Sequence, residues 1–257
     1  MFSVHRQNIL ELQDVGFSYY RQGNFIENLA FTIGDGEFIG LLGANGSGKS
    51  TILKLAGGLI RPQNGSIRLW GKPLESYRNK DRAKLLCYLP QLLDARIPFR
   101  VRELVAMGLY PYDIPPEMTV DEALRAVGLR EKADSYLANL SGGERRRAFI
   151  AMTILQGAGL LLLDEPLANL DIKYQIEFQR LLSELRETKN ISVIMALHDI
   201  NLALRFGKVI LLKEGKVLGT GKPEEVLTDS LLKEALDVSV EVRQDSDGSY
   251  IRYGRAL

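Results

Sequence analysis

The chain has 257 residues, which is enough to bury a substantial core in one large domain or two small ones. Hydrophobic residues make up 46% and charged residues 25%, a composition that excludes disordered, collagen-like and coiled-coil classes. The formal net charge is +1, so no overall field would attract the protein to nucleic acid or an acidic membrane. The apolar runs are strand-sized, too short to span a bilayer. The single cysteine, Cys87, excludes an intramolecular disulfide, fits a reducing compartment and is expected to pack as a small hydrophobe.

Alternating apolar and polar residues predict strands at 9–15 and 25–33. A buried strand is expected at 37–42, and a short strand with turn residues on both sides at 65–70. A helix is expected at 49–56, stopped by Gly57-Gly58. Between 99 and 157 prolines separate helix-length segments, and helices are expected at 101–107, 120–127 and 144–155. Strands at 160–163, 191–197 and 209–212 then alternate with helices at 172–187 and 201–205.

This order of elements implies a mainly parallel sheet covered by helices. The predicted fold class is therefore α/β, with an N-terminal antiparallel β layer and a helical insertion in the core. We assign residues 1–257 to a single domain and residues 92–157 to an inserted helical subdomain. After about Pro223 the chain is expected to form a short helical pair and a hairpin-like end.

A glycine-rich segment between a buried strand and a helix predicts a P-loop, because it matches the pattern G-x-x-x-x-G-K-[ST] in the context that this motif requires. Its glycines let successive backbone N–H groups point at phosphates, and the helix adds its positive end. Lys49 is expected to pair with the β- and γ-phosphates, and the Ser50 hydroxyl to bind Mg²⁺. The expected nucleotide-binding residues of this segment are Gly43, Ala44, Asn45, Gly46, Ser47, Gly48, Lys49, Ser50 and Thr51.

An acid pair follows the apolar run 160–163, which has the character of a strand buried on both faces. In open α/β sheets ligands gather at the carboxyl ends of strands, so both acids are expected to face the phosphate cradle. Asp164 would hold Mg²⁺ through water, and Glu165 would accept a proton from the attacking water. Taken alone, the same residues are equally typical of a plain turn.

Two further polar residues follow predicted strands. His198 comes after 191–197, where its imidazole N–H is expected to donate to a γ-phosphoryl oxygen. Gln91 ends a candidate strand at 86–90, just before the helical insertion, where its amide is expected to contact Mg²⁺ or the attacking water. We therefore place Lys49, Gln91, Glu165 and His198 in the catalytic set and Ser50, Gln91 and Asp164 around the metal.

The segment Leu140–Glu144 has the sequence Leu-Ser-Gly-Gly-Glu and directly precedes a predicted helix. Ser141 and Glu144 have the spacing of a helix-capping box, which explains two of the five residues. The capping box does not explain the pair Gly142-Gly143, and two glycines at a helix start favour a second anion site. One chain would then carry two phosphate-binding helix ends.

With these motifs in this order, the sequence resembles the nucleotide-binding subunits of ABC transporters over nearly its whole length. The resemblance rests on the P-loop, Gln91, Leu140–Glu144, the acid pair, Asn169-Leu170-Asp171 and His198. It implies a P-loop ABC ATPase fold and a head-to-tail homodimer that holds two ATP molecules. Each ATP would lie between one subunit's P-loop and the other subunit's Ser141, Gly142, Gly143 and Glu144. Asp171 joins the nucleotide-binding set.

The resemblance further implies that an early aromatic residue stacks on adenine; Tyr19 matches its position and Tyr20 is the close rival. It implies ATP and Mg²⁺ as cofactors, transmembrane permease subunits as partners, no nucleic acid, and a peripheral place on the cytoplasmic face of the membrane. A periplasmic or extracellular binding protein would be a partner only indirectly.

Two positions depart from the family pattern. The loop after the acid pair has Leu167-Ala168 where the family usually has Thr-Ser, which removes two hydroxyls from this loop. Glu144 replaces the commoner glutamine, and we expect little consequence because the backbone and Ser141 do the binding.

The segment 101–111 resembles the corresponding part of importers of iron–siderophores, haem and cobalamin, although Leu109 stands where these commonly have arginine. Exposed aromatic residues are expected here, at Phe99, Tyr110 and Tyr112, facing a permease helix. The alternatives are the motor of a metal-ion importer or exporter, and a non-transport ABC ATPase. The latter tends to carry tandem cassettes, coiled coils or basic arms, none of which this sequence shows. A small-molecule kinase or GTPase would leave the segment Leu140–Glu144 without a role.

Overall fold

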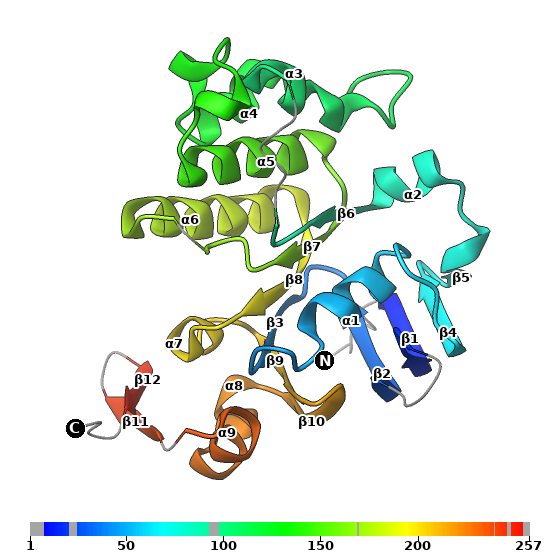
Figure 1. Cartoon of the computed structure of the whole chain (residues 1–257), viewed down its shortest axis with the longest axis vertical. Helices are drawn as coiled ribbons and strands as arrows, with labels where there is room; N and C mark the ends of the chain where they lie inside the picture. The colour runs from blue at the N-terminus through cyan, green and yellow to red at the C-terminus, as the bar shows by residue number, and fades with distance from the viewer. Residues whose placement is uncertain are drawn as a thin grey trace, which may run out of the picture. The chain divides into compact units, whose positions relative to one another are not determined.

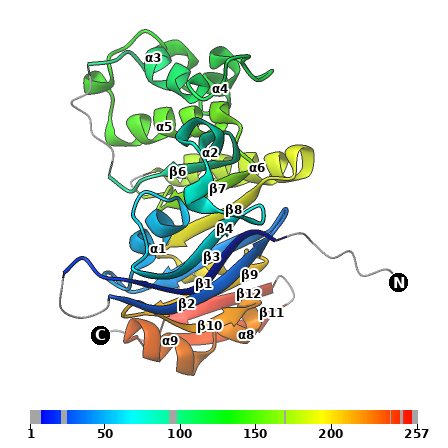
Figure 2. The ribbon, with the colours of Figure 1, turned by 90° about the vertical axis from the view of Figure 1, so that its right-hand side faces the viewer.

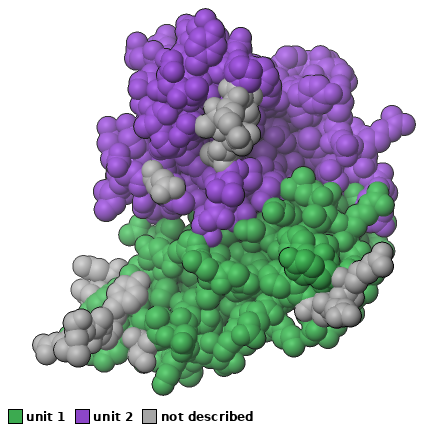
Figure 3. Space-filling view, in the orientation of Figure 1, with its two compact units in different colours: residues 1–74, 193–257 green, residues 75–192 purple. Residues whose placement is uncertain are grey.

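The computed structural model describes residues 8–20, 25–92, 98–168, 170–238, 240–245 and 248–253. Among these residues no helix is both long and apolar enough to cross a membrane. The chain forms two compact units, coloured separately in Figure 3: unit 1 comprises 1–74 and 193–257, and unit 2 comprises 75–192. Each unit is described by itself.

The N-terminal part of unit 1 is an antiparallel sheet, as predicted (Figure 2). Its strands follow the order β2-β1-β4-β5, and β1 pairs with both β2 and β4. Apolar residues on one face, such as Leu10, Leu12 and Ile33, are fully buried, whereas Gln13 and Thr32 are exposed. The bounds are β1 (Asn8–Phe17), β2 (Ile26–Gly34), β4 (Asn64–Leu69) and β5 (Lys72–Pro73).

A second layer of unit 1 holds four strands in the order β10-β9-β3-β8. The central strand β3 runs parallel to β8 on one side and β9 on the other, while β10 is antiparallel to β9. All residues of β3 after the first are buried, which explains its continuous apolar sequence. The bounds are β3 (Phe38–Gly43), β8 (Ser192–Leu197), β9 (Lys208–Lys213), β10 (Lys216–Gly221), α1 (Lys49–Ala56) and α7 (Ile200–Ala203).

The C-terminal part of unit 1 forms two short helices and a hairpin, in agreement with the sequence expectation (Figure 1). Side chains tie the hairpin to the rest of the unit: the Asp229 carboxylate accepts from the Val242 amide at 2.9 Å, and the Asn201 side chain accepts from the Ile251 amide at 2.8 Å. The bounds are α8 (Pro223–Val226), α9 (Asp229–Leu236), β11 (Val240–Asp245) and β12 (Gly248–Tyr253).

Unit 2 combines two parallel strands, β6 and β7, with a set of helices. Helix α5 lies against α3 and α4 in both ribbon views (Figures 1 and 2). A glycine is required just after α3, because a Cβ on Gly108 would lie 2.5 Å from the Met152 carbonyl oxygen of α5. The bounds are α2 (Asn79–Leu85), β6 (Leu86–Leu89), α3 (Val101–Ala106), α4 (Val120–Ala126), α5 (Gly142–Gln156), β7 (Leu160–Asp164) and α6 (Ile172–Lys189).

Three elements were absent from the sequence expectation: β5, α2 and β10. Helix α2 has no buried residue, and β10 is a half-exposed strand with glycines at 219 and 221, so neither shows a clear apolar period. The helix expected to begin at 144 begins two residues earlier, at Gly142. Helices α3, α4 and α5 do fall within 92–157, but the compact unit that contains them is wider, and the single-domain assignment stays a prediction.

Candidate functional site

The P-loop of unit 1 connects the buried strand β3 to α1. Lys49 is 5% exposed, and its Nζ donates to the Gly43 carbonyl at 2.7 Å and the Ala44 carbonyl at 3.1 Å. The ammonium group is therefore held against the loop's own backbone. Helix α1 has no acidic residue in its first turn and no side-chain cap on its N-terminal N–H groups. These N–H groups and the Lys49 charge suit an anionic ligand.

Two glycines of the loop adopt backbone conformations that other residues rarely take: Gly46 has φ +78° and Gly48 has φ +105°. The Ser47 hydroxyl is buried and has no hydrogen-bond partner within the described part of the chain. A buried hydroxyl without a partner costs free energy, about 1–3 kcal/mol. A phosphate oxygen in the loop could satisfy it, so the loop fits the ligand that its sequence predicts.

The two rival tyrosines have different surroundings. The Tyr19 hydroxyl is 3.1 Å from the Thr51 hydroxyl on α1, and its ring packs edge-on against Phe17 with centroids 4.8 Å apart. Tyr19 is 53% exposed, whereas Tyr20 is 81% exposed. A half-exposed ring anchored to the P-loop helix suits stacking on a base better than a ring in solvent.

His198 lies at the same sheet edge as the P-loop. In the parallel pairing of β3 with β8, Leu42 is opposite Leu197, so Gly43 and His198 both follow the last paired residues. The imidazole is exposed at this edge. Both residues therefore lie where ligand-binding residues are expected, after parallel strands.

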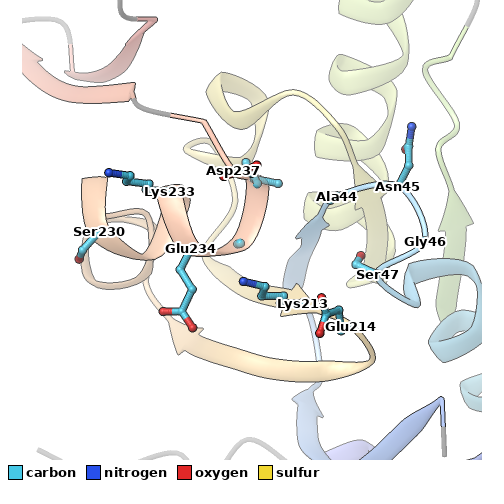
Figure 4. Close-up of a pocket in the computed structure, with 12 residues that line it drawn as sticks. Ala44, Asn45, Gly46, Ser47, Lys213, Glu214, Ser230, Lys233, Glu234 and Asp237 are labelled. Carbon is cyan, nitrogen blue, oxygen red and sulfur yellow. The ribbon is translucent and has the colours of Figure 1, made fainter. Parts of the chain in front are cut away.

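Beside the P-loop lies an open pocket of about 760 Å³ (Figure 4). One wall is the loop itself at 44–47; Lys213 and Glu214 of the β9–β10 turn and residues of α9 form the others. The turn is fixed to the loop, because the Gly215 amide donates to the Ser47 carbonyl at 2.9 Å. This face of the loop is thus accessible and carries charges of both signs.

In unit 2, the strands β6 and β7 end side by side, since Leu89 pairs with Leu163. Gln91 and Glu165 follow these ends and touch: Gln91 Nε2 donates to Glu165 Oε2 at 2.6 Å. Glu165 is buried and has φ +50°, a left-handed conformation that is unusual for a residue with a side chain. Strained backbone of this kind concentrates at functional positions.

Asp164 is 1% exposed, and one of its carboxylate oxygens accepts from the Tyr88 hydroxyl at 3.1 Å. Hydroxyl, amide and carboxylate oxygens are ligands that Mg²⁺ prefers. The predicted metal residues Ser50, Gln91 and Asp164 supply one of each. Among the described residues, no group of three or more histidine, cysteine or acidic side chains forms a metal cluster. By donor type, the three predicted residues fit Mg²⁺.

Arg146 is the site residue that sequence reasoning missed. It is 4% exposed, and its guanidinium donates five hydrogen bonds to backbone carbonyls at the ends of both strands. The acceptors are Pro90 at 2.7 Å, Gln91 at 2.9 Å, Asp164 at 2.7 Å, Glu165 at 2.7 Å and Pro166 at 3.0 Å. Burial lowers the pKa of Arg146 to about 10, although the negative charges of Asp164 and Glu165 act to raise it. The guanidinium therefore stays protonated at neutral pH. The sequence has three consecutive arginines on a predicted helix, and it gave no sign of which one would hold the two strand ends.

The segment Leu140–Glu144 begins α5 with the capping box that its sequence predicts. The Glu144 amide donates to the Ser141 hydroxyl at 3.2 Å, and the Ser141 amide donates to Glu144 Oε2 at 2.9 Å. Glu144 also accepts from the Lys132 ammonium; this bond and the Ser141 amide lower the pKa of Glu144. A glutamine could not form this ion pair with Lys132. The ion pair therefore gives a structural reason for Glu144 where the family more commonly has glutamine. Ser141 and Gly142 are exposed at the helix start.

Asp171 is the N-cap of α6, but its side chain makes no capping hydrogen bond. Its neighbour Asn169, part of the same predicted motif, lies outside the described residues. Cys87 is buried as expected, and its thiol donates to Gln156 Oε1 at 2.9 Å. Burial raises the pKa of Cys87 to about 12, so this thiol is unreactive at neutral pH.

Comparison with known proteins places these motifs in one family. Residues 26–168 match the ABC transporter family. The petrobactin import ATP-binding protein of Bacillus anthracis is 39% identical over 230 residues, which cover 86% of this chain and 85% of that protein. The hemin import ATP-binding protein of Rhodopseudomonas palustris (strain BisA53) is 36% identical over 234 residues, which cover 87% and 86%.

A solved structure supports the same assignment. The dimeric structure of an ATP-binding cassette in a post-hydrolysis state, bound to ADP and phosphate, superimposes with a TM-score of 0.74 at 26% identity. The superposition covers 83% of this chain and 98% of the other. With its P-loop, its acid pair and its signature segment Leu140–Glu144, the chain belongs to the ABC transporter family and is an ATP-binding, ATP-hydrolysing subunit of that family.

Proposed function

We propose that this chain hydrolyses Mg²⁺-bound ATP and so powers an importer of iron–siderophore, haem or cobalamin. The observation that carries the ATPase part is the P-loop with Lys49 held inside it, together with the fixed acid pair of unit 2. A Lys49 ammonium gives the β- and γ-phosphates a positive partner, and the N–H groups at the start of α1 add donors. Tyr19 stacks on adenine.

The chemistry requires a base for the attacking water and donors for the developing charge. Glu165 is the base, and Gln91, bonded to it at 2.6 Å, orients its carboxylate and the water. His198 donates to a γ-phosphoryl oxygen. Ser50, Gln91 and Asp164 would hold Mg²⁺, which would supply positive charge against the phosphates.

A second copy of the chain completes the nucleotide site. Ser141 and Gly142 are exposed at the start of α5, where they are accessible to a ligand held by another subunit. We propose a head-to-tail homodimer in which this segment and Asp171 of one copy face the ATP of the other. The dimeric arrangement of the superimposed ATP-binding cassette supports this.

The partner that spans the membrane is a permease, and the segment around Tyr110 is the proposed docking face. Of the three aromatics expected to be exposed there, only Tyr110 is largely exposed, at 76%. Phe99 and Tyr112 are half-buried, which corrects the expectation; the Tyr112 hydroxyl donates to the Gln156 carbonyl at 2.7 Å and therefore anchors the segment to α5. Ile114 is 85% exposed, so Tyr110 and Ile114 are more exposed than Met107, a third accessible apolar side chain of the segment, at 43%.

The cargo class follows from the relatives, which are named for petrobactin and hemin import, and from the likeness of 101–111 to that subgroup. The subunit would lie at the cytoplasmic face of the membrane. The rival, a motor for another cargo, shares every catalytic residue. Uptake by vesicles that contain the purified complex separates the two, with ferric siderophores, haem and corrinoids as the cargo set.

The Lys49→Ala variant tests the phosphate cradle. It should weaken ATP binding and lower kcat for ATP hydrolysis by at least about a hundredfold, because the phosphates lose their fixed charge. Fluorescent-nucleotide binding and phosphate release measure the two effects. Turnover at the wild-type rate would remove Lys49 from the catalytic set.

The Glu165→Gln variant separates binding from hydrolysis. The amide keeps the size of the side chain and removes the base, so ATP should bind, persist and hold two copies together. We expect turnover to disappear and an ATP-dependent dimer to appear in size-exclusion chromatography. A variant that hydrolyses ATP normally and stays monomeric would assign the base to another residue.

The Arg146→Met variant tests the hydrogen bonds from the Arg146 guanidinium to the five backbone carbonyls. It leaves up to five carbonyl groups without their donor, so the free energy of unfolding should fall by more than about 3 kcal/mol. Arg146→Lys keeps the charge but cannot span the same acceptors, and it should retain the fold while lowering kcat. Thermal unfolding and ATPase assays measure both variants. Arg180→Met, which removes an exposed arginine of α6, is the control and should change neither quantity.

The double variant Tyr110→Asp with Ile114→Asp tests the docking face. Both side chains are exposed, so the ATPase activity of the isolated subunit should stay within about twofold of wild type. Co-purification with the permease and cargo uptake should both be lost. Tyr250→Asp, an exposed tyrosine of unit 1, serves as the control. Intact uptake by the double variant would place the docking face elsewhere.

A further inference from the structure

Arg147, the residue after Arg146 on α5, packs against the first turn of α6. Its side chain is 6% exposed, and the guanidinium carbon lies 3.4 Å from the centroid of the Tyr174 ring. Tyr174 is three residues after Asp171, the N-cap of α6. Ser141, the N-cap of α5, is six residues before Arg147. One stacked pair thus connects the helices that begin with these two N-caps.

The stack leaves part of the guanidinium unsatisfied. Within the residues that the structure describes, Arg147 Nε and Nη1 are buried and have no hydrogen-bond partner. Buried donors without partners lower stability, and the attraction between a cation and an aromatic face offsets only part of that loss. Arg146, one position earlier on the same helix, uses all three of its nitrogens. Stability alone therefore does not explain why a charged side chain occupies position 147.

A ligand does not explain it either. Arg147 and Tyr174 line a cavity of about 20 Å³ with Leu170, Glu177 and other residues of α4, α5 and α6. A cavity of this size holds at most one water molecule. The remaining role of the pair is mechanical: it fixes α6 against α5.

We infer that Arg147 is a positioning residue, whose stack on Tyr174 sets the place of Asp171 relative to Ser141. The Asp171 side chain makes no bond to its own helix, so the placement of this residue depends on how the first turn of α6 is held. The inference rests on the proposed function, in which Ser141 and Asp171 face the nucleotide of a second copy. Arg147 then acts on the closed, hydrolysing dimer and not on the initial capture of ATP by the P-loop.

The test compares Arg147→Met with Lys173→Met in steady-state ATPase assays and thermal unfolding. Methionine fills the space of the arginine stem without the charge, so Tm should be unchanged or higher. The kcat should fall about tenfold while KM for ATP changes by less than about twofold. Lys173 is the matched control: it is exposed, its Nζ lies 5.6 Å from the same ring, and its loss should leave kcat unchanged.

Variants of Tyr174 complete a double-mutant cycle with Arg147→Met. Tyr174→Phe keeps the aromatic face and should retain activity, whereas Tyr174→Leu should reproduce the kcat loss of Arg147→Met. The double variant Arg147→Met with Tyr174→Leu should be no worse than either single variant, because both remove one shared contact.

Three results overturn the inference. The first is an unchanged kcat for Arg147→Met, and the second is additive losses of kcat in the double variant. The third is a fall in the Tm of Arg147→Met together with a matching rise in KM, which would show that the side chain is purely structural. A wild-type protein without ATPase activity would contradict the proposed function instead. The two failures are therefore distinguishable.

Discussion

The guanidinium of Arg146 holds the ends of β6 and β7 in one arrangement, and the geometry of the acid pair depends on it. Planar N–H donors can reach carbonyls of two chain segments at once, which a lysine ammonium cannot do with the same directionality. The five acceptors belong to consecutive residues, Pro90-Gln91 and Asp164–Pro166. Because these residues are fixed by their backbone, Gln91 and Glu165 meet at 2.6 Å and Glu165 can keep an unfavourable φ of +50°.

Helix α5 connects several functional parts of unit 2. It begins with the exposed Ser141, and one turn later it carries Arg146 and Arg147, which hold the acid pair and the start of α6. Near its end, the Gln156 carbonyl accepts from Tyr112, and Gly108 lies close to the Met152 carbonyl. The segment around Tyr110, which we propose as the docking face, is thus joined to the same helix that begins with the segment Leu140–Glu144. A rigid helix of 15 residues can carry a displacement from one end to the other without local rearrangement.

Unit 1 carries the P-loop, which can hold an anion at an open site without enclosing it. Strand β3 is central and buried, so the P-loop leaves the sheet from a fixed point, and His198 follows the neighbouring strand at the same edge. Two side chains of the loop can donate to phosphate: the Ser47 hydroxyl has no partner among the described residues, and the Lys49 ammonium donates to the Gly43 and Ala44 carbonyls. These bonds can be exchanged for bonds to phosphate at little cost, because the ammonium is already desolvated and placed.

The sequence by itself determined the α/β class, the position of the P-loop, the acid pair at a strand end, the capping box at Ser141 and the family. Each of these depends on local chemistry: apolar period, glycine spacing, and the rule that ligands gather after parallel strands. Only the tertiary structure decided that Arg146, and not its neighbours, holds the two strand ends, and that Glu144 pairs with Lys132. The tertiary structure also decided that the Tyr112 hydroxyl is bonded to α5 while the Tyr110 side chain is exposed, and that Arg147 stacks on Tyr174. These contacts join residues 12 to 56 positions apart in the chain, and a sequence pattern cannot specify them because each depends on which helix face the whole fold buries.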